Sequence, residues 1–504
     1  MCLAFTRFKI KPPPHRRFGM ITNYLESRQA RRKQQKDQRK AIRNQEKLEE
    51  QVYHKIQHLL KNVFSENTIK EIAKKTGFEQ REKKLNSFVI VSILMIGVIN
   101  TTESDPIPSL ERLCLILRKW FKIDVLPQSL LERINRKETA LFIKEITLEV
   151  LKYEVNKSLV KCLKNRRFGI DLFSRILLQD STVVSLPETL WRMFRGCGGA
   201  ASKAAVKYDF IIDQCSHVIV RVKFTAGKNP DATMSGEIIN YLEEGDLVIR
   251  DLGYFNLSQL SKINNKNAYF ISRLSISANV YLNKEDKNPI DLIEHLKKLN
   301  INDKNVDIDV YIGQKERLLV RLVAIKVPPE VIEARRKRQK ETKAKKEPSE
   351  ALHEWNGFTI MITNIPKIKL SVKMILIIYK IRWQIELFFK NMKSQLSVDG
   401  ITGKNKYRIL CIIYLKIVLT WMVTILYAYA QNLIVDKEVS LFKFTKWLKE
   451  DERLKKACIS GDFFDLLKEL ERDIDLLCKQ KRTKKTTAED IEMTYETEKY
   501  TKAA

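Results

Sequence analysis

Four polar residues recur at one angular position in an otherwise apolar segment, "YKIRWQIELFFKNMK". They are Tyr379, Arg382, Glu386 and Lys393. At about 100° per residue, all four fall within an arc of roughly 60° on a helix. The apolar residues occupy the neighbouring face, so the pattern predicts a helix from about 369 to 396 that packs on a core and presents a polar edge. An ordinary amphipathic helix with a charged flank would show the same pattern.

Two aspartates each follow a short apolar run with the character of a strand. Asp180 follows "RILLQ", and Asp251 follows "DLVIR", with Gly253 placed to permit a tight turn. Carboxylates at the ends of strands in a parallel or mixed sheet lie in the usual ligand crevice of an α/β fold. Each aspartate alone could instead be a turn residue or a helix cap. Together with Glu386 they form a carboxylate set suited to Mg²⁺, and two such ions about 4 Å apart serve phosphoryl transfer.

The charge balance points to a polyanionic partner. The 504 residues carry a formal net charge of +31, which favours nucleic acid, although an anionic membrane surface is a competing interpretation. The stretch 409–435 is membrane-like in composition, but Lys416 and Gln431 interrupt it. Its uninterrupted part, 417–430, is shorter than the roughly 20 apolar residues that span a bilayer. We therefore expect a buried core helix there.

Cysteine and histidine usage indicates a cytoplasmic protein without a zinc or disulfide framework. The eight cysteines are dispersed and include no CxxC pair, and the six histidines are equally scattered. The N-terminal segment lacks the long apolar core of a signal peptide. Any metal is therefore expected to be a hard cation held by carboxylates.

The organisation along the chain predicts an α/β protein with a mixed sheet. An exposed, mobile excursion is expected from Ala334 to Lys346, where eight positive residues accompany one negative residue. The tail from 479 is polar and is expected to be disordered. The predicted regions are a basic helical arm (1–60), an α-helical DNA-binding domain (61–165), a first core part (166–277), a β-rich insertion (278–357), a second core part (358–435), and C-terminal helices with a polar tail (436–504).

The three motifs together resemble those of the DDE transposases of bacterial insertion sequences, in the group with the YREK signature. That signature is Tyr, two residues, Arg, three residues, Glu, six residues and Lys, and the opening segment matches it without a gap. "DSTVVSLP" and "DLGYF" match the first and second aspartate motifs of the group. The resemblance covers about 170–435. It implies an RNase H-like core, a β-rich insertion between the second aspartate and the glutamate, and an N-terminal helical domain that binds the terminal inverted repeats.

The resemblance also implies an activity and its partners. Asp180, Asp251 and Glu386 would be the catalytic residues and would hold two Mg²⁺ (or Mn²⁺) ions. The enzyme would hydrolyse the 3′ ends of its element and join them to target DNA. Its partners would be double-stranded DNA with terminal inverted repeats, target DNA, and a second copy in a homodimer on DNA, with no membrane.

Several side chains are expected to contact DNA. The resemblance implies phosphate contacts near the transposon end from Tyr379, Arg382 and Lys393. Lys390 and Trp383 extend the same helix edge, although Trp383 could simply be packed. Arg250 and Arg273 flank candidate strands and could add phosphate contacts, and the alternative for each is an ordinary surface charge.

One departure from the family concerns a flipped base. Members can hold such a base against a tryptophan in the strand before the YREK helix. Here Phe358 or Thr359 stands nearest to that place and Trp355 lies a few residues earlier, so a stack from Trp355 or Phe358 is one expectation. In relatives, a DNA hairpin intermediate depends on such base flipping, so the departure puts in doubt whether this enzyme forms a hairpin. The same departure supports an alternative function, a non-catalytic DNA-binding derivative of a transposase. A third hypothesis is a membrane-associated protein.

Overall fold

The computed structural model describes most of the chain, in two compact units, 1–54 and 55–504. The described residues are 50–79, 84–152, 157, 163, 172–199, 201–299, 305–342, 350–434, 437–479 and 493–494. A helix covers 50–63, and the rest of the predicted basic arm lies outside the described residues. The predicted polar tail from 480 onward also lies outside them, apart from 493–494. All contacts reported below are within the second unit.

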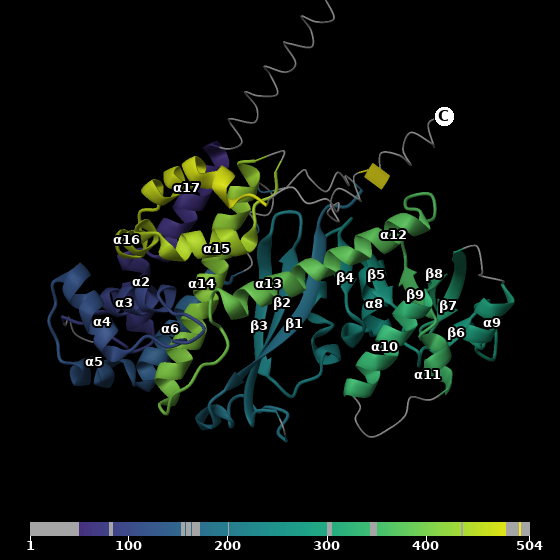
Figure 1. Cartoon of the computed structure of the whole chain (residues 1–504), viewed down its shortest axis with the longest axis horizontal. Coiled ribbons are helices and arrows are strands. Elements are labelled where there is room, and N and C mark those ends of the chain that lie inside the picture. The colour runs from purple at the N-terminus through teal and green to yellow at the C-terminus, as the bar shows by residue number, and fades with distance from the viewer. Residues whose placement is uncertain are drawn as a thin grey trace, which may run out of the picture. The chain divides into compact units, whose positions relative to one another are not determined.

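One nine-stranded sheet forms the centre of the fold, in the order β3-β2-β1-β4-β5-β9-β8-β7-β6 (Figure 1). Its first half contains β1 (Ile176–Leu186), β2 (Ala204–Asp213), β3 (Val218–Ala226), β4 (Leu247–Arg250) and β5 (Tyr269–Arg273). Strand β2 pairs antiparallel with both β1 and β3, whereas β4 is parallel to β1 and β5 is parallel to β4. This mixed sheet confirms the predicted RNase H-like α/β core.

The second half of the sheet contains the strands of the predicted insertion. It consists of β6 (Val280–Tyr281), β7 (Val306–Ile312), β8 (Leu318–Lys326) and β9 (Phe358–Thr363). Strand β9 pairs antiparallel with both β5 and β8, so it joins the insertion strands to the core strands. The insertion therefore extends the central sheet rather than forming a separate one.

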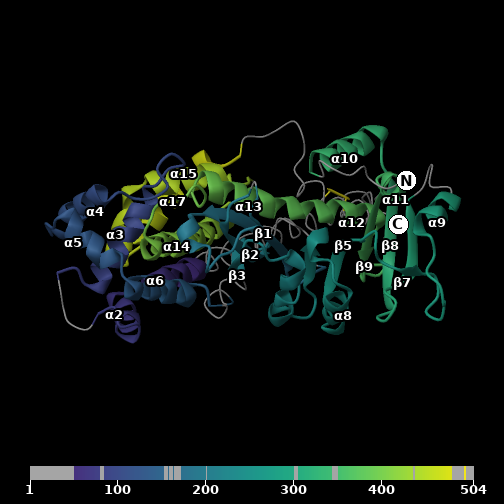
Figure 2. The ribbon, with the colours of Figure 1, turned by 90° about the horizontal axis from the view of Figure 1, so that it is seen from below.

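Helices cover both faces of the sheet. On one face lie α12 (Val372–Tyr379) and α13 (Trp383–Ser394), and on the other lies α8 (Leu257–Asn265) (Figure 2). Phe388 and Phe389 of α13 pack on Phe210 of β2, with ring centroids 5.2 and 5.7 Å apart.

The prediction of one continuous helix from about 369 to 396 is wrong in one respect. A 3₁₀ turn, Lys380–Arg382, separates α12 from α13. At this break the Lys380 N–H bonds to the Ile377 carbonyl, three residues back, which is the tighter 3₁₀ pattern. Tyr379 therefore ends one helix, and Arg382 precedes the next.

The basic cluster of the insertion is a docked helix in its described part. Helix α10 (Pro329–Thr342) is held by Arg335, whose guanidinium donates to the carbonyls of Asn356 and Phe358 at 2.9 and 2.7 Å and to the Thr359 hydroxyl at 2.7 Å. The prediction of a mobile excursion is therefore wrong for 334–342, and 343–349 lie outside the described residues. The short helix α11 (Glu350–Trp355) follows before β9.

A helical body surrounds α14 (Lys406–Asn432). This helix is long and apolar enough to cross a membrane, but its whole apolar window is buried inside the protein, which confirms the predicted core helix. It contacts helices from both ends of the chain, namely α3 (Ser87–Ile99), α6 (Lys137–Val150), α15 (Leu441–Glu450) and α17 (Phe464–Leu477). Other α-helices in the described part of the chain are α2 (Glu66–Lys75), α4 (Leu110–Ile116), α5 (Pro127–Ile134), α9 (Leu292–Lys298) and α16 (Glu452–Ser460).

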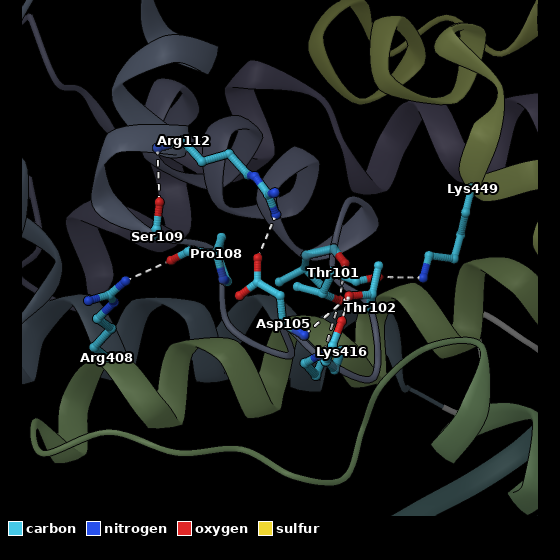
Figure 3. A network of polar contacts seen from close by, with 11 residues as sticks. Thr101, Thr102, Asp105, Pro108, Ser109, Arg112, Arg408, Lys416 and Lys449 are labelled. Carbon is cyan, nitrogen blue, oxygen red and sulfur yellow. Dashed lines mark hydrogen bonds and ion pairs between the residues drawn. The ribbon is translucent and has the colours of Figure 1, made fainter.

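Two lysines, one buried and one half-buried, connect this body to the end of α13, and both also reach Thr101 (Figure 3). Lys416 of α14 donates to the Thr101 hydroxyl at 3.1 Å and to the Leu396 carbonyl at 3.2 Å. Lys449 of α15 donates to the carbonyls of Thr101 and Gln395 at 2.7 and 2.5 Å. Because the carbonyls at a helix C-terminus lack intrahelical donors, the two ammonium groups satisfy them and oppose the negative end of the helix dipole.

Burial of Lys416 makes the stability of the fold depend on pH. Burial lowers its pKa to about 7, with Lys449 lowering it further and Asp105 opposing this. The charged form therefore destabilises the fold fully below pH 7, and that cost disappears as pH rises toward the ordinary lysine pKa of about 10.4. We compare the free energy of unfolding of the unsubstituted protein with that of Lys416→Met. The difference should shift in favour of the unsubstituted protein by roughly 1 kcal/mol per pH unit as pH rises from 7 toward the ordinary lysine pKa.

Urea unfolding at several pH values checks this expectation. Lys446→Met, at an exposed lysine of α15, is the matched control and should follow the parent at every pH. Parallel stability curves for the parent and Lys416→Met would contradict the assignment.

Candidate active site

The register between β1 and β4 brings the two predicted aspartates together. Gln179 of β1 pairs with Arg250 of β4 in parallel, so Asp180 and Asp251 follow at the same level of the sheet. At this point β4 ends and the 3₁₀ turn Leu252–Tyr254 begins, with Asp251 at its N-terminal cap position. The strand pairing therefore places two acidic side chains next to each other. The prediction that a strand ends at Asp180 is wrong, because β1 continues to Leu186.

Asp180 lies in a partly buried and electrostatically strained position. Its Oδ1 accepts a hydrogen bond from the Ser181 N–H at 2.8 Å. Burial raises the pKa of Asp180 to about 6. The Ser181 N–H and Arg382 oppose this rise, whereas the charges of Asp251 and Asp231 reinforce it. The carboxyl group therefore remains ionised near neutrality at an appreciable cost.

Arg382 is the cation around which the acidic residues gather. Its Nη1 lies 3.6 Å from Oδ2 of Asp180, and its Nη2 lies 2.5 Å from Oε1 of Glu386. Burial disfavours the charged guanidinium, but Asp251, Tyr379 and Glu386 outweigh burial and raise the pKa of Arg382. The three predicted carboxylates thus lie near Arg382, as does the phenol of Tyr379.

Tyr379 completes this cluster from the end of α12. Burial and the nearby Asp251 raise its pKa to about 12, against the opposing effect of Arg382 and Arg273. The phenol therefore stays protonated at neutral pH and can act as a hydrogen-bond donor.

The donor chemistry of the cluster fits a hard divalent cation. In the described part of the chain, acidic, His and Cys side chains form no group of three close enough to hold a metal ion. Arg382 instead lies between Asp180 and Glu386. Carboxylate oxygens are the ligands that Mg²⁺ and Mn²⁺ prefer. The carboxylates therefore suit such an ion in their chemistry, and the Arg382 guanidinium pairs with two of them in this structure.

Lys393, Lys390 and Trp383 lie along the same helix. Lys393 donates to the Val183 carbonyl at 3.0 Å, on the continuation of β1 beyond Asp180. Lys390 and Lys393 line a hollow of about 540 Å³ with Glu103, Ser394, Asp399 and Gly400. Trp383 is 57% exposed, which excludes the alternative that it is simply packed.

The three remaining candidates differ in their surroundings. Arg250 is only 2% exposed and donates to the Ser235 carbonyl at 2.7 Å, so the prediction that it contacts DNA is wrong. Arg273 ends β5 half-buried and is electrostatically close to Tyr379, which leaves its DNA contact a prediction. Trp355 packs against the apolar core that the insertion shares with the sheet. Phe358 is buried at 8% exposure, so it does not offer a free stacking surface.

Sequence reasoning missed the polar layer on the opposite side of β1. Ser181 donates to Asp231 at 2.7 Å, and Lys207 forms an ion pair with the same carboxylate at 2.8 Å. The only sequence signal was "KNPDATMS", which predicts a turn because of its Asn-Pro-Asp run. A turn signal does not reveal which strand residues the turn contacts.

The raised pKa of Asp180 predicts a stabilising substitution. Because its pKa is about 6 in the folded chain, against an ordinary value of about 4, the ionised carboxylate destabilises the fold above pH 6. Asp180→Asn should therefore raise the free energy of unfolding at pH 8 by roughly 2 to 3 kcal/mol, and the gain should vanish by about pH 4. Chemical denaturation without added metal measures this. An Asp180→Asn protein that is less stable than the parent at pH 8 would contradict the assignment.

Comparison with known proteins identifies a family for this chain. The chain matches the family described as "Transposase DDE domain" over residues 171–422. A cryo-EM structure of a piggyBac transposase synaptic complex with hairpin DNA aligns with 86% of this chain and 87% of that chain, at 9% identity. Its TM-score of 0.39 is too low to support a conclusion about either protein.

Two bacterial relatives are similar over most of their length. The transposase for insertion sequence element IS231B of Bacillus thuringiensis subsp. berliner is 29% identical over 437 residues, which are 82% of this chain and 89% of the relative. The transposase for insertion sequence element IS231F of Bacillus thuringiensis subsp. israelensis is 30% identical over 370 residues, or 69% of this chain and 75% of the relative. The chain thus belongs to the DDE transposases of bacterial insertion sequences.

Proposed function

We propose that this transposase binds the terminal inverted repeats of its element, hydrolyses the 3′ ends in a metal-dependent reaction and joins them to target DNA. The observation that carries the proposal is the gathering of Asp180, Asp251 and Glu386 around Arg382. Three acidic groups from two strands and a helix, all close to one cation, suit a phosphoryl-transfer site. The relatives named as transposases for insertion sequence elements support the same activity.

Asp180, Asp251 and Glu386 would hold two Mg²⁺ or Mn²⁺ ions. When bound, such ions stabilise the attacking and leaving oxygens of an in-line displacement. The residues of this chain would supply binding and orientation. Arg382, once it leaves Glu386, can pair with a phosphate in a bidentate manner, because its guanidinium presents a planar fork of donors.

The phosphate contacts would continue along α13. Tyr379, which is protonated at neutral pH, would donate to a phosphate oxygen beside the scissile bond. Lys393 of α13 lies beside Val183, which follows Asp180 along β1. Lys390 faces solvent, and both lysines line the same hollow. Exposed Trp383 offers an aromatic surface at the other end of the helix.

The wider partners follow from charge and from the reaction. A net charge of +31 favours binding to duplex DNA in the cytoplasm. The helices within 61–165 would recognise the inverted repeats. Because the reaction joins two element ends together, we expect a homodimer on DNA. Trp355 and Arg273 stay candidates for DNA contacts near the entrance to the site.

Loss of one acidic residue should abolish cleavage. With Mg²⁺ and a duplex that carries the element end, the parent should nick DNA, and Asp251→Asn and Glu386→Gln should each be slower by a hundredfold or more, on the scale of roughly 10²–10³ for losing one electrostatic stabiliser. Gel analysis of end-labelled DNA measures the rates. Asp309→Asn, at an exposed strand residue of the insertion, is the control and should cleave normally. Absence of cleavage by the parent would favour a non-catalytic DNA-binding derivative, and equal nicking by Asp251→Asn would refute the site.

Removal of a phosphate contact should change the salt dependence of DNA binding. Lys393→Ala should weaken binding to all duplexes alike and reduce the slope of log K against log salt by about 1. Fluorescence anisotropy at several salt concentrations measures the slope. Lys446→Ala, at an exposed lysine of α15, is the control. An unchanged slope for Lys393→Ala would exclude its phosphate contact.

A further inference from the structure

One short segment contacts the residues on both sides of Asp180. This segment, residues 229–235 between β3 and β4, is called the brace below. Gln179 donates to the Met234 carbonyl at 3.1 Å, and the Ser181 hydroxyl donates to Oδ1 of Asp231 at 2.7 Å. Because successive strand residues point to opposite faces, Gln179 and Ser181 reach the brace while Asp180 points toward α13. The brace therefore holds the backbone of β1 directly behind Asp180.

The same segment contacts the residues on both sides of Asp251. Arg250 donates to the Ser235 carbonyl at 2.7 Å. Beyond Asp251, the Asp231 carboxylate lies so close to Gly253 that a Cβ there would be 3.2 Å from Oδ2. The turn that contains Asp251 therefore rests on the same carboxylate that binds Ser181.

The brace is itself fixed by a buried cation. Lys207 of β2 is 7% exposed and donates to Oδ1 of Asp231 at 2.8 Å and to the Asn229 carbonyl at 2.6 Å. Beside it, Asp209 accepts hydrogen bonds from the Tyr254 hydroxyl at 2.5 Å and from Gln179 at 3.2 Å. These contacts leave the brace little freedom to shift, because each lost contact would leave a buried polar group unsatisfied.

We propose that the brace sets the spacing between Asp180 and Asp251, and that Asp231 is its central positioning residue. The inference rests on the proposed function, in which these two aspartates hold divalent ions. Asp231 touches no ion itself. It binds Ser181, next to one ligand, and supports Gly253, two residues after the other. The spacing of two carboxylates determines how well they share an ion, so the contacts of Asp231 should appear in the affinity for metal.

Two substitutions separate positioning from simple stability. Asp231→Ala removes the acceptor for Ser181 and the contact with Gly253, whereas Asp231→Asn keeps an oxygen and the shape of the side chain. Both remove the negative charge that pairs with the buried Lys207 ammonium, so both should lose stability. Only a positioning role predicts that they differ in metal affinity.

The test measures Mn²⁺ binding to the full-length protein on a duplex with a pre-cleaved element end. Electron paramagnetic resonance reports free Mn²⁺ directly and does not depend on turnover. We expect Asp231→Ala to bind Mn²⁺ roughly tenfold more weakly than the parent, the scale on which residues that orient metal ligands act. Asp231→Asn should regain most of that affinity, and Asp309→Ala should bind as the parent does.

The outcomes separate this inference from the proposed function. If Asp180→Asn loses Mn²⁺ binding while Asp231→Ala retains the parent affinity, the brace has no positioning role. Equal losses in Asp231→Ala and Asp231→Asn, matched by equal losses of unfolding stability, would also overturn it. If the parent does not bind Mn²⁺, or if Asp180→Asn binds it as tightly as the parent, the proposed function fails and the inference fails with it.

Discussion

Mutual repulsion between neighbouring carboxylates is the constraint that this site has to satisfy. The parallel register of β1 and β4 fixes Asp180 and Asp251 at the same level, and neither backbone can retreat without breaking the sheet. The Arg382 guanidinium offsets this repulsion by pairing with Asp180, and it also contacts Glu386. Burial raises the pKa of Asp180 to about 6, and the charges of Asp251 and Asp231 make smaller contributions in the same direction. A site built in this way favours added positive charge, which is a useful property for binding divalent ions.

The helix that brings Glu386 to the aspartates is fixed along its whole length. Phe388 and Phe389 set its distance from the sheet by packing on Phe210. At its C-terminal end, Lys416 and Lys449 bind the last carbonyls and link them to the helical body around α14. The position of the glutamate therefore depends on contacts with strands and with helices from distant parts of the sequence.

Sequence reasoning reached the parts of the site that local pattern determines. Asp180 and Asp251 could be predicted because each ends an apolar run, and α14 could be predicted as a core helix because its apolar stretch is interrupted by Lys416. Arg250 was misjudged, since only the tertiary structure shows that its side chain turns away from the surface to the Ser235 carbonyl. The docking of α10 through Arg335 depends on carbonyls some twenty residues away, and no periodicity in the sequence reports such contacts.

The 3₁₀ turn between α12 and α13 was also beyond sequence reasoning, because the segment contains neither proline nor glycine to signal a break. The polar edge predicted from a continuous helix nevertheless gathers at one place. Arg382 precedes α13 directly, and Glu386 follows one turn later, so their contact needs only local geometry. Tyr379 reaches the same place from the preceding helix.

The way the insertion joins the sheet has a consequence for how such enzymes diversify. The chain passes from β5 into β6 to β8 and returns through β9, which pairs with β5 on one side and with β8 on the other. The insertion can therefore lengthen, shorten or be exchanged for another module while β9 still delivers the chain to α12 at the same point.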